Sequence, residues 1–96
     1  MITHIVFFRL KDSSEQGLAK TKAVLQNMEG KIAELQFIEV GVNVVASPRN
    51  YDLALVTKFA SLTDLDAYQV HPAHVEVLGY MKEALREPSV AIDYEA

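Results

Sequence analysis

The sequence contains no cysteine and no tryptophan, and it has only three prolines and four glycines among its 96 residues. Without cysteine the chain has no disulfide, no thiolate nucleophile and no cysteine-based zinc or iron–sulfur site. It has no basic run and carries a net charge of −4, which argues against nucleic acid or an anionic membrane as a partner. No apolar stretch approaches the roughly 20 residues that a transmembrane helix needs.

The N-terminal region lacks the features of a targeting segment. Residues 1–10 contain no basic n-region, no long apolar core and no small-residue cleavage site. We therefore expect a soluble, cytoplasmic protein. With 50% hydrophobic and 23% charged residues the composition is that of a folded chain, and we expect one domain over residues 1–96.

Four stretches rich in β-branched and aromatic residues predict strands. They cover residues 2–10, 37–45, 52–59 and 89–94. Each is bounded by charged, proline-containing or serine-containing segments that are typical of turns and helix starts. The chain therefore contains enough strands for a small sheet.

The segments between these strands show the apolar periodicity of helices. Apolar residues from Leu18 to Leu35 recur at spacings of three and four, which predicts a helix that begins at Ser13 or Ser14 and ends near Gly30. A second helical pattern begins at Ser61 and is broken at Pro72, a residue suited to the first turn of a new helix. The order β-α-β-β-α-β predicts a ferredoxin-like α+β fold, with a four-stranded antiparallel sheet covered by helices on one face.

Both faces of the predicted sheet carry apolar residues, although helices cover only one of them. In the first strand Ile5 and Phe7 lie on one face, and His4, Val6 and Phe8 lie on the other. We assign the face of His4 to the side without helices. An uncovered face should alternate toward polar residues, so a second layer is needed. We expect a second copy to supply it, in a homodimer formed through the helix-free sheet face.

The three histidines are candidate functional residues. His71 and His74 flank Pro72 at the break between the helices, and His4 lies in the first strand. Histidines three residues apart resemble metal ligands, but the break at Pro72 separates their directions and no carboxylate lies within the motif. We therefore expect no metal and no cofactor. An apolar enclosure lowers the pKa of a histidine and favours the neutral form, which can act as a base.

These residues also have structural interpretations. His71 can cap a helix by bonding free backbone groups, and we expect it, with Pro72, to be mainly structural. His4 can be a hydrogen-bonded core histidine, and Tyr68 a packing residue. The chain reversal at Pro72 can also turn Tyr68 and His74 toward one pocket together with His4. A neutral imidazole beside a phenol is suited to proton abstraction next to a carbonyl.

The motif Tyr-x-x-His-Pro-Ala-His at residues 68–74 resembles that of the stress-responsive α/β-barrel (Dabb) family, within the dimeric α+β barrel proteins. The resemblance extends over the chain and includes residues 2–11, 52–56 and 90–94. It implies a ferredoxin-like fold and a barrel made by two chains. It also implies that most relatives have no established activity, while some plant members are associated with stress tolerance.

Within the family, the motif is similar to that of the cofactor-independent plant olivetolic acid cyclase, which closes a linear polyketide by aldol condensation. This similarity implies His74 as general base and Tyr68 as hydrogen-bond donor, with His4 as a third site residue. Residues 75–80 show no pattern that dictates a polyketide substrate.

Several functions therefore remain open. The first is a homodimer that binds a small, largely apolar molecule in a pocket between sheet and helices. The second is a cofactor-free cyclase, lyase or isomerase that uses His74 and Tyr68. A monooxygenase of the kind found among related barrels and a structural role in a larger stress-related assembly are further alternatives.

Overall fold

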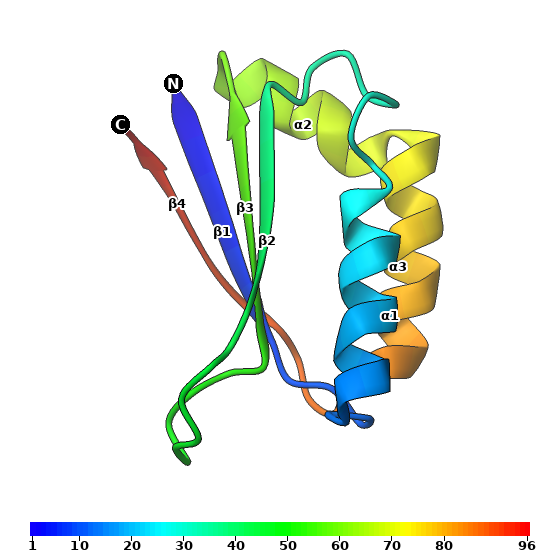
Figure 1. Ribbon diagram of the computed structural model, residues 1–96. Helices are drawn as coiled ribbons and strands as arrows, with labels where there is room; N and C mark the ends of the chain where they lie inside the picture. Colours follow the sequence, from blue (N-terminus) through cyan, green and yellow to red (C-terminus); the bar gives the residue numbers. More distant parts are fainter.

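The computed structural model describes residues 1–96, and its seven elements follow the predicted order (Figure 1). They are β1 (Ile2–Phe8), α1 (Glu15–Gln26), β2 (Phe37–Val42), β3 (Leu53–Phe59), α2 (Leu62–Val70), α3 (Pro72–Ala84) and β4 (Val90–Glu95). This order confirms the ferredoxin-like α+β prediction, with the second helix in two pieces. None of the three helices combines the length and apolar character that crossing a bilayer requires.

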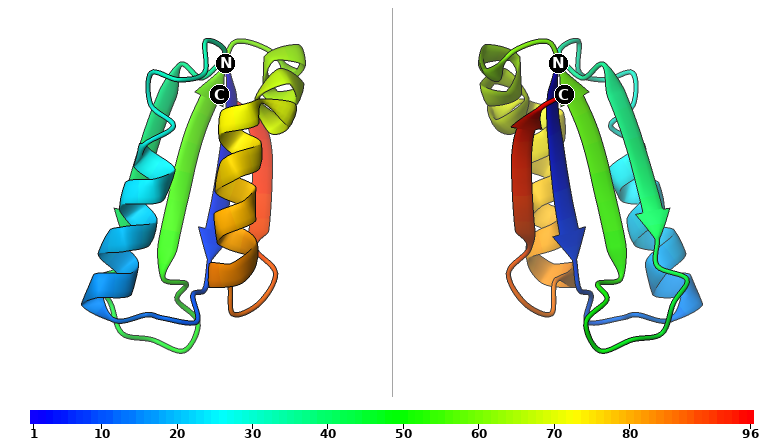
Figure 2. Two further views of the ribbon diagram at one scale, coloured as in Figure 1. Left: turned by 90° about the vertical axis from the view of Figure 1, so that its right-hand side faces the viewer. Right: turned by 90° about the vertical axis from the view of Figure 1, so that its left-hand side faces the viewer.

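The four strands form one antiparallel sheet in the order β2-β3-β1-β4. The central strand β1 pairs with β3 on one side and with β4 on the other, so that Ile5 lies opposite both Val56 and Ile92. Helices α1 and α3 run side by side over one face, and α2 crosses near one end of the sheet (Figures 1 and 2). The opposite face carries no helix, as the right-hand view of Figure 2 shows.

Side-chain caps fix where the first two helices begin. The hydroxyl of Ser14 accepts the backbone N–H of Gly17 at 3.2 Å, and that of Ser61 accepts the N–H of Asp64 at 3.2 Å. Helix α1 ends at Gln26, earlier than the apolar spacing predicted, and a turn follows in which Gly30 adopts φ +80°. Ile32 is nevertheless only 3% exposed, so its core contact is made from a loop and not from a helix.

The core lies between the sheet and the helices. Alternate residues of β3 are buried because successive strand side chains point to opposite faces. Each helix contributes residues to the same cluster, which joins Val6, Phe8, Val40, Leu53, Leu55 and Phe59 of the sheet to Leu25, Leu65, Tyr68, Val77 and Met81 of the helices. Part of this cluster, including Val6, Phe8, Tyr68 and Met81, lines the site described below.

The assignment of His4, Val6 and Phe8 to the helix-free face is wrong. These side chains face the helices and are only 8%, 8% and 6% exposed, whereas Phe7 lies on the bare face with 39% exposed. The period of two along a strand determines which residues share a face, but not which face the helices cover. Because β1 is apolar on both faces, its sequence pattern does not distinguish them.

The helix-free side of the sheet is an exposed apolar surface, which we call the open face. The strand register places its side chains in rows across the sheet, one of which contains Ile5, Val56 and Ile92. The large exposed members of the open face are Phe7, Phe37, Val90, Ile92 and Tyr94, each at least 39% exposed. A contiguous apolar surface of this kind is typical of a protein–protein interface.

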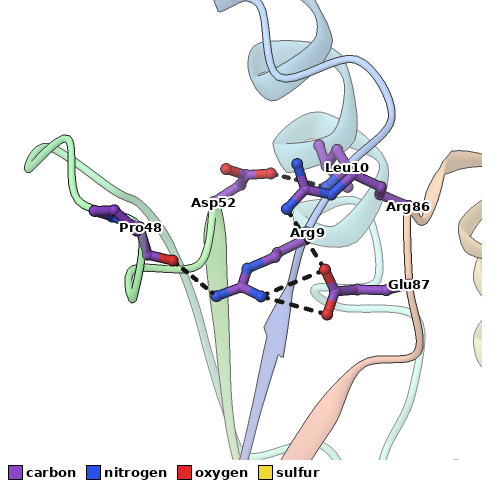
Figure 3. A network of polar contacts seen from close by, with 6 residues as sticks. All are labelled: Arg9, Leu10, Pro48, Asp52, Arg86 and Glu87. Atoms are coloured by element: carbon purple, nitrogen blue, oxygen red, sulfur yellow. Dashed lines mark hydrogen bonds and ion pairs between the residues drawn. The ribbon is translucent and has the colours of Figure 1, made fainter.

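A polar network ties the end of β1 to the two neighbouring loops (Figure 3). Arg9 donates from one guanidinium nitrogen to both carboxylate oxygens of Glu87, at 3.3 and 3.4 Å, and from another to the carbonyl of Pro48 at 3.4 Å. The carboxylate of Asp52 accepts the N–H of Leu10 at 2.8 Å. The network holds the segment before β4 beside β1, and β4 forms one wall of the cavity described next.

Candidate functional site

A cavity of about 350 Å³ lies between the sheet and α3. Its floor comes from alternate residues of β1, with Leu55 of β3, and one wall comes from β4; residues of α1, α2 and α3 line the remaining sides. Eleven of its 16 lining residues are hydrophobic, and the polar ones gather mostly at one end. There His4, Tyr68, Gln69, His74 and Asp93 line the same space. The structure thus brings together all three residues that the sequence proposed as catalytic.

His4 and Asp93 form a pair across neighbouring strands. The register of β1 and β4 sets the two residues opposite each other, and Oδ1 of Asp93 bonds Nδ1 of His4. An ionised carboxylate only accepts hydrogen bonds, so Nδ1 of His4 carries a hydrogen and Nε2 is left for the cavity. The His4 side chain is 10% exposed and the Asp93 side chain 45%. Asp93 therefore fixes the tautomer and the direction of the His4 ring.

His74 is held in one orientation by the backbone of α2. Its Nδ1 lies 3.0 Å from the carbonyl oxygen of Gln69, which can only accept, so Nδ1 carries the hydrogen and the neutral ring has its lone pair on Nε2. No protein group bonds Nε2. Burial lowers the pKa of His74 because it penalises the imidazolium; a charge on His4 acts in the same direction, and the Gln69 carbonyl opposes both. His74 is thus a neutral hydrogen-bond acceptor with a free nitrogen.

Tyr68 lines the polar end of the cavity and is fully buried. Its ring lies 4.8 Å from that of Phe59, 4.3 Å from that of His74 and 6.4 Å from that of His4, measured between centroids. Its hydroxyl has a single partner, the Met28 sulfur at 3.9 Å, which is a weak acceptor. Burial raises the pKa of the Tyr68 hydroxyl, so the phenol stays protonated and can donate a hydrogen bond.

His71 lies outside the cavity and serves the helix junction. The ring Nδ1 of His71 accepts the backbone N–H of Ala73 at 3.1 Å. The backbone N–H of His71 donates to the carbonyl of Tyr68 at 3.1 Å. One residue therefore ends α2 and begins α3, with Pro72 in the first turn of α3. The two histidines of the motif point to different surroundings, and no group of three or more potential ligands is arranged to hold a metal ion.

Asp93 is the site residue that sequence reasoning missed. It stands in the terminal strand, where it follows three consecutive apolar residues, Val90, Ala91 and Ile92. Its position opposite His4 depends on the register between β1 and β4, two strands from opposite ends of the sequence. The only available signal was the charge itself, in a strand otherwise rich in apolar residues.

Comparison with known proteins identifies relatives over the whole length of the chain. A family model described as Stress responsive A/B Barrel Domain (Dabb) matches residues 2–96. Among curated proteins, none matches the sequence. The family match covers both ends of the candidate site, from His4 in β1 to Asp93 in β4.

Solved structures with the same fold include two bacterial proteins described as dimeric and of unknown function. That from Bacteroides fragilis is 28% identical, with a TM-score of 0.80 over 99% of this chain and 95% of that one. That from Thermobifida fusca is 27% identical, with a TM-score of 0.85 over 99% of this chain and 90% of that one. A hydroxynitrile lyase from Passiflora edulis, 20% identical, shares the fold with a TM-score of 0.82 over 97% of this chain and 90% of that one.

Proposed function

Because this chain belongs to the stress-responsive A/B barrel (Dabb) family, we propose that it is a homodimer that binds a small, largely apolar molecule in the cavity between the sheet and α3. The observation that carries this proposal is the composition of the cavity, which is apolar along most of its length and polar at one end. Binding sites for small molecules have this construction, in which apolar walls supply affinity and a few polar groups fix orientation.

The homodimer is supported by the open face and by the relatives. The two bacterial structures that are most similar in sequence among those compared above are described as dimeric. In the proposed dimer the open faces of two copies pack together, which removes Phe7, Ile92 and Tyr94 from water. The cavity lies on the other side of the sheet, so each copy keeps its own binding site.

Filling the cavity tests the binding function. The fluorescent probe is N-phenylnaphthylamine, a neutral apolar dye. The variant is Ala91→Phe, because Ala91 lines the cavity from the exposed strand β4. We expect roughly tenfold weaker dye binding, since the added ring occupies the space that the dye needs. The matched control is Ala46→Phe, in an exposed loop away from this cavity. Equal dye binding by wild type and Ala91→Phe contradicts the proposal.

A second function, cofactor-free proton transfer next to a carbonyl, is supported by two groups at the polar end of the cavity, the unpartnered Nε2 of His74 and the weakly bonded hydroxyl of Tyr68. Nε2 of His74 takes a proton from the carbon beside the carbonyl. The electron pair of that C–H bond forms an enolate, whose oxygen accepts a hydrogen bond from the Tyr68 hydroxyl. An enolate is the shared intermediate of aldol cyclisation, isomerisation and related lyase reactions, so this step suits several of the reactions that the motif implies.

Hydrogen exchange tests this step without knowledge of the natural substrate. The probe is methyl heptyl ketone in deuterium oxide, and proton NMR follows the loss of signal from the hydrogens beside its carbonyl. We expect exchange above the buffer rate with wild type, and a loss of roughly a hundredfold or more in His74→Gln. Binding of the ketone without accelerated exchange restricts the protein to the binding function.

A further inference from the structure

We propose that the cavity selects an electrically neutral ligand, an elongated ketone, aldehyde or ester, and discriminates against the corresponding carboxylate. The carbonyl of this ligand lies at the end formed by His74 and Tyr68, and its apolar part extends toward Phe8 and Leu85. The inference rests on the proposed binding function, and it specifies the chemical class of the molecule bound.

The first argument for a neutral ligand comes from the charged residues that line the cavity. The lining includes no lysine and no arginine, and its only carboxylate is that of Asp93. The Asp93 charge is offset at most by one proton on its partner His4. The polar end therefore bears a net charge of minus one or zero. A carboxylate that leaves water needs a compensating cation, and here it meets another carboxylate instead.

The second argument for a neutral ligand comes from the hydrogen-bonding groups at the polar end of the cavity. Nε2 of His74 is an acceptor, because the Gln69 carbonyl keeps the ring hydrogen on Nδ1. Tyr68 offers one hydroxyl donor, whose present partner is the weak sulfur acceptor of Met28. One donor satisfies the oxygen of a ketone or an ester. A carboxylate presents two oxygens with about four acceptor sites, and it has no hydrogen to give to Nε2 of His74.

Protonation of His74 does not rescue carboxylate binding. Burial lowers the pKa of this imidazole, and any charge on His4 lowers it further. The ring is therefore neutral at about pH 7, where a carboxylic acid is ionised. A bound carboxylate would have to supply the energy that moves a proton onto a desolvated ring.

The length of the cavity indicates that its ligand is elongated. Its floor is formed by His4, Val6 and Phe8, which are alternate residues of β1. At about 3.3 Å per residue these positions extend over roughly 13 Å. The end opposite the histidines is lined by Phe8, Met81 and Leu85, with Ser89 as its polar member. A cavity of about 350 Å³ is at the small end for ligand sites, which suits one alkyl chain or one ring.

A pair of probes of equal size tests the inference. Methyl heptyl ketone and octanoate carry the same heptyl chain and differ in that a methyl group replaces a charged oxygen. Calorimetric titration of the full-length protein at about pH 7, where octanoate is ionised, measures both affinities. We expect the ketone to bind at least roughly tenfold more tightly than octanoate. Octanoate affinity equal to or greater than that of the ketone overturns the inference and leaves the binding function intact.

Two variants identify the charge responsible. Asp93→Asn removes the carboxylate and keeps an amide oxygen that can accept from Nδ1 of His4. We expect it to raise the affinity for octanoate relative to the ketone by roughly fivefold or more. The control is Glu95→Gln, which removes the same charge from the same strand, two residues away and outside the cavity. An unchanged ratio in Asp93→Asn, or an equal rise in Glu95→Gln, contradicts the role of the Asp93 charge.

The failure of the inference is distinct from the failure of the function. If neither the ketone nor octanoate binds, and Ala91→Phe leaves dye binding unchanged, the cavity is not a ligand site and both proposals fall. If both probes bind without the expected preference, only the selection for neutral ligands is wrong.

Discussion

The imidazole of His74 lies against the phenol ring of Tyr68, with 4.3 Å between the ring centroids, and no hydrogen bond joins them. The imidazole bonds the Gln69 carbonyl, and the phenol points to the Met28 sulfur. The contact is therefore one of packing, and it leaves one acceptor and one weakly engaged donor at the cavity. The helix break at Pro72 produces this arrangement, because a single continuous helix would not fold the two side chains over each other.

Removal of the Tyr68 hydroxyl separates its binding role from its packing role. Tyr68→Phe keeps the buried ring and loses only the weak contact with sulfur, so we expect the free energy of unfolding to change by less than about 1 kcal/mol. The affinity for methyl heptyl ketone should fall roughly twofold to tenfold, the effect of one neutral hydrogen bond. Urea unfolding and calorimetric titration measure the two effects.

The matched control for this variant is Tyr80→Phe. The Tyr80 hydroxyl is 3.3 Å from that of Thr21 and lies outside the cavity. We expect it to affect stability and not ketone affinity. Equal loss of affinity in both variants would show that neither hydroxyl contacts the ligand directly.

The protonation of His74 links stability to pH. Its pKa in the folded protein lies below the ordinary value of 6.5, so below pH 6.5 the unfolded chain binds a proton that the folded chain resists. Stability therefore falls as the pH decreases through this window and is fully retained above it. Urea unfolding between about pH 7.5 and pH 5 should show a shallower decline for His74→Gln than for wild type. Parallel pH profiles, or a His74 pKa above 7 by NMR titration, would contradict the proposed neutral state.

His71 should affect stability without affecting the ligand. His71→Ala removes the acceptor for the N–H of Ala73, and we expect a loss of about 1 kcal/mol in the free energy of unfolding. His71→Asn, which retains a capping oxygen, should recover part of that loss. Ser61→Ala removes the cap of α2 and serves as a comparison. A His71→Ala variant with normal thermal stability but no ketone binding would make His71 a cavity residue after all.

Charge on the open face should dissociate the dimer without unfolding the chain. Ile92 is 56% exposed in β4, so Ile92→Lys is tolerated by a monomer, while burial of its charge in the interface costs about 3 kcal/mol, roughly a hundredfold in affinity. Light scattering after size exclusion should show dimer for wild type and monomer for the variant. Val44→Lys, at a loop position 93% exposed, is the control and should remain dimeric. Wild-type protein that is a stable folded monomer would refute the interface.

The sequence predicted the elements well because each has a local signal. Ser61, Pro72 and the alternation in β3 are visible without any knowledge of distant residues. The predicted end of α1 near Gly30 lies a few residues beyond the observed end at Gln26, because Met28 continues the helical spacing within the turn that follows the helix. Apolar spacing reports burial, and burial continues beyond the last turn of the helix.

The site was predictable only where its residues are close in sequence. The proximity of Tyr68 and His74 follows from the helix break between them. The pairing of His4 with Asp93, and the face of the sheet that His4 occupies, depend on long-range packing that no local pattern encodes. For that reason the sequence proposed three residues that the structure places around one cavity, assigned one of them to the wrong side of the sheet and did not identify its partner.

The position of β1 has a consequence for the speed of folding. This strand occupies the middle of the sheet, and its first residue, Ile2, pairs with Phe59 on one side and Glu95 on the other. Both neighbours of β1 are therefore far from it in sequence. The entropy cost of closing these long loops must be met before the hydrogen bonds between β1 and either neighbour stabilise the fold. Domains that combine helices with such non-local strand pairing fold more slowly than helical bundles, which form in about microseconds to milliseconds. Substitutions that weaken the contacts of β1 should therefore slow refolding wherever those contacts are already formed in the transition state.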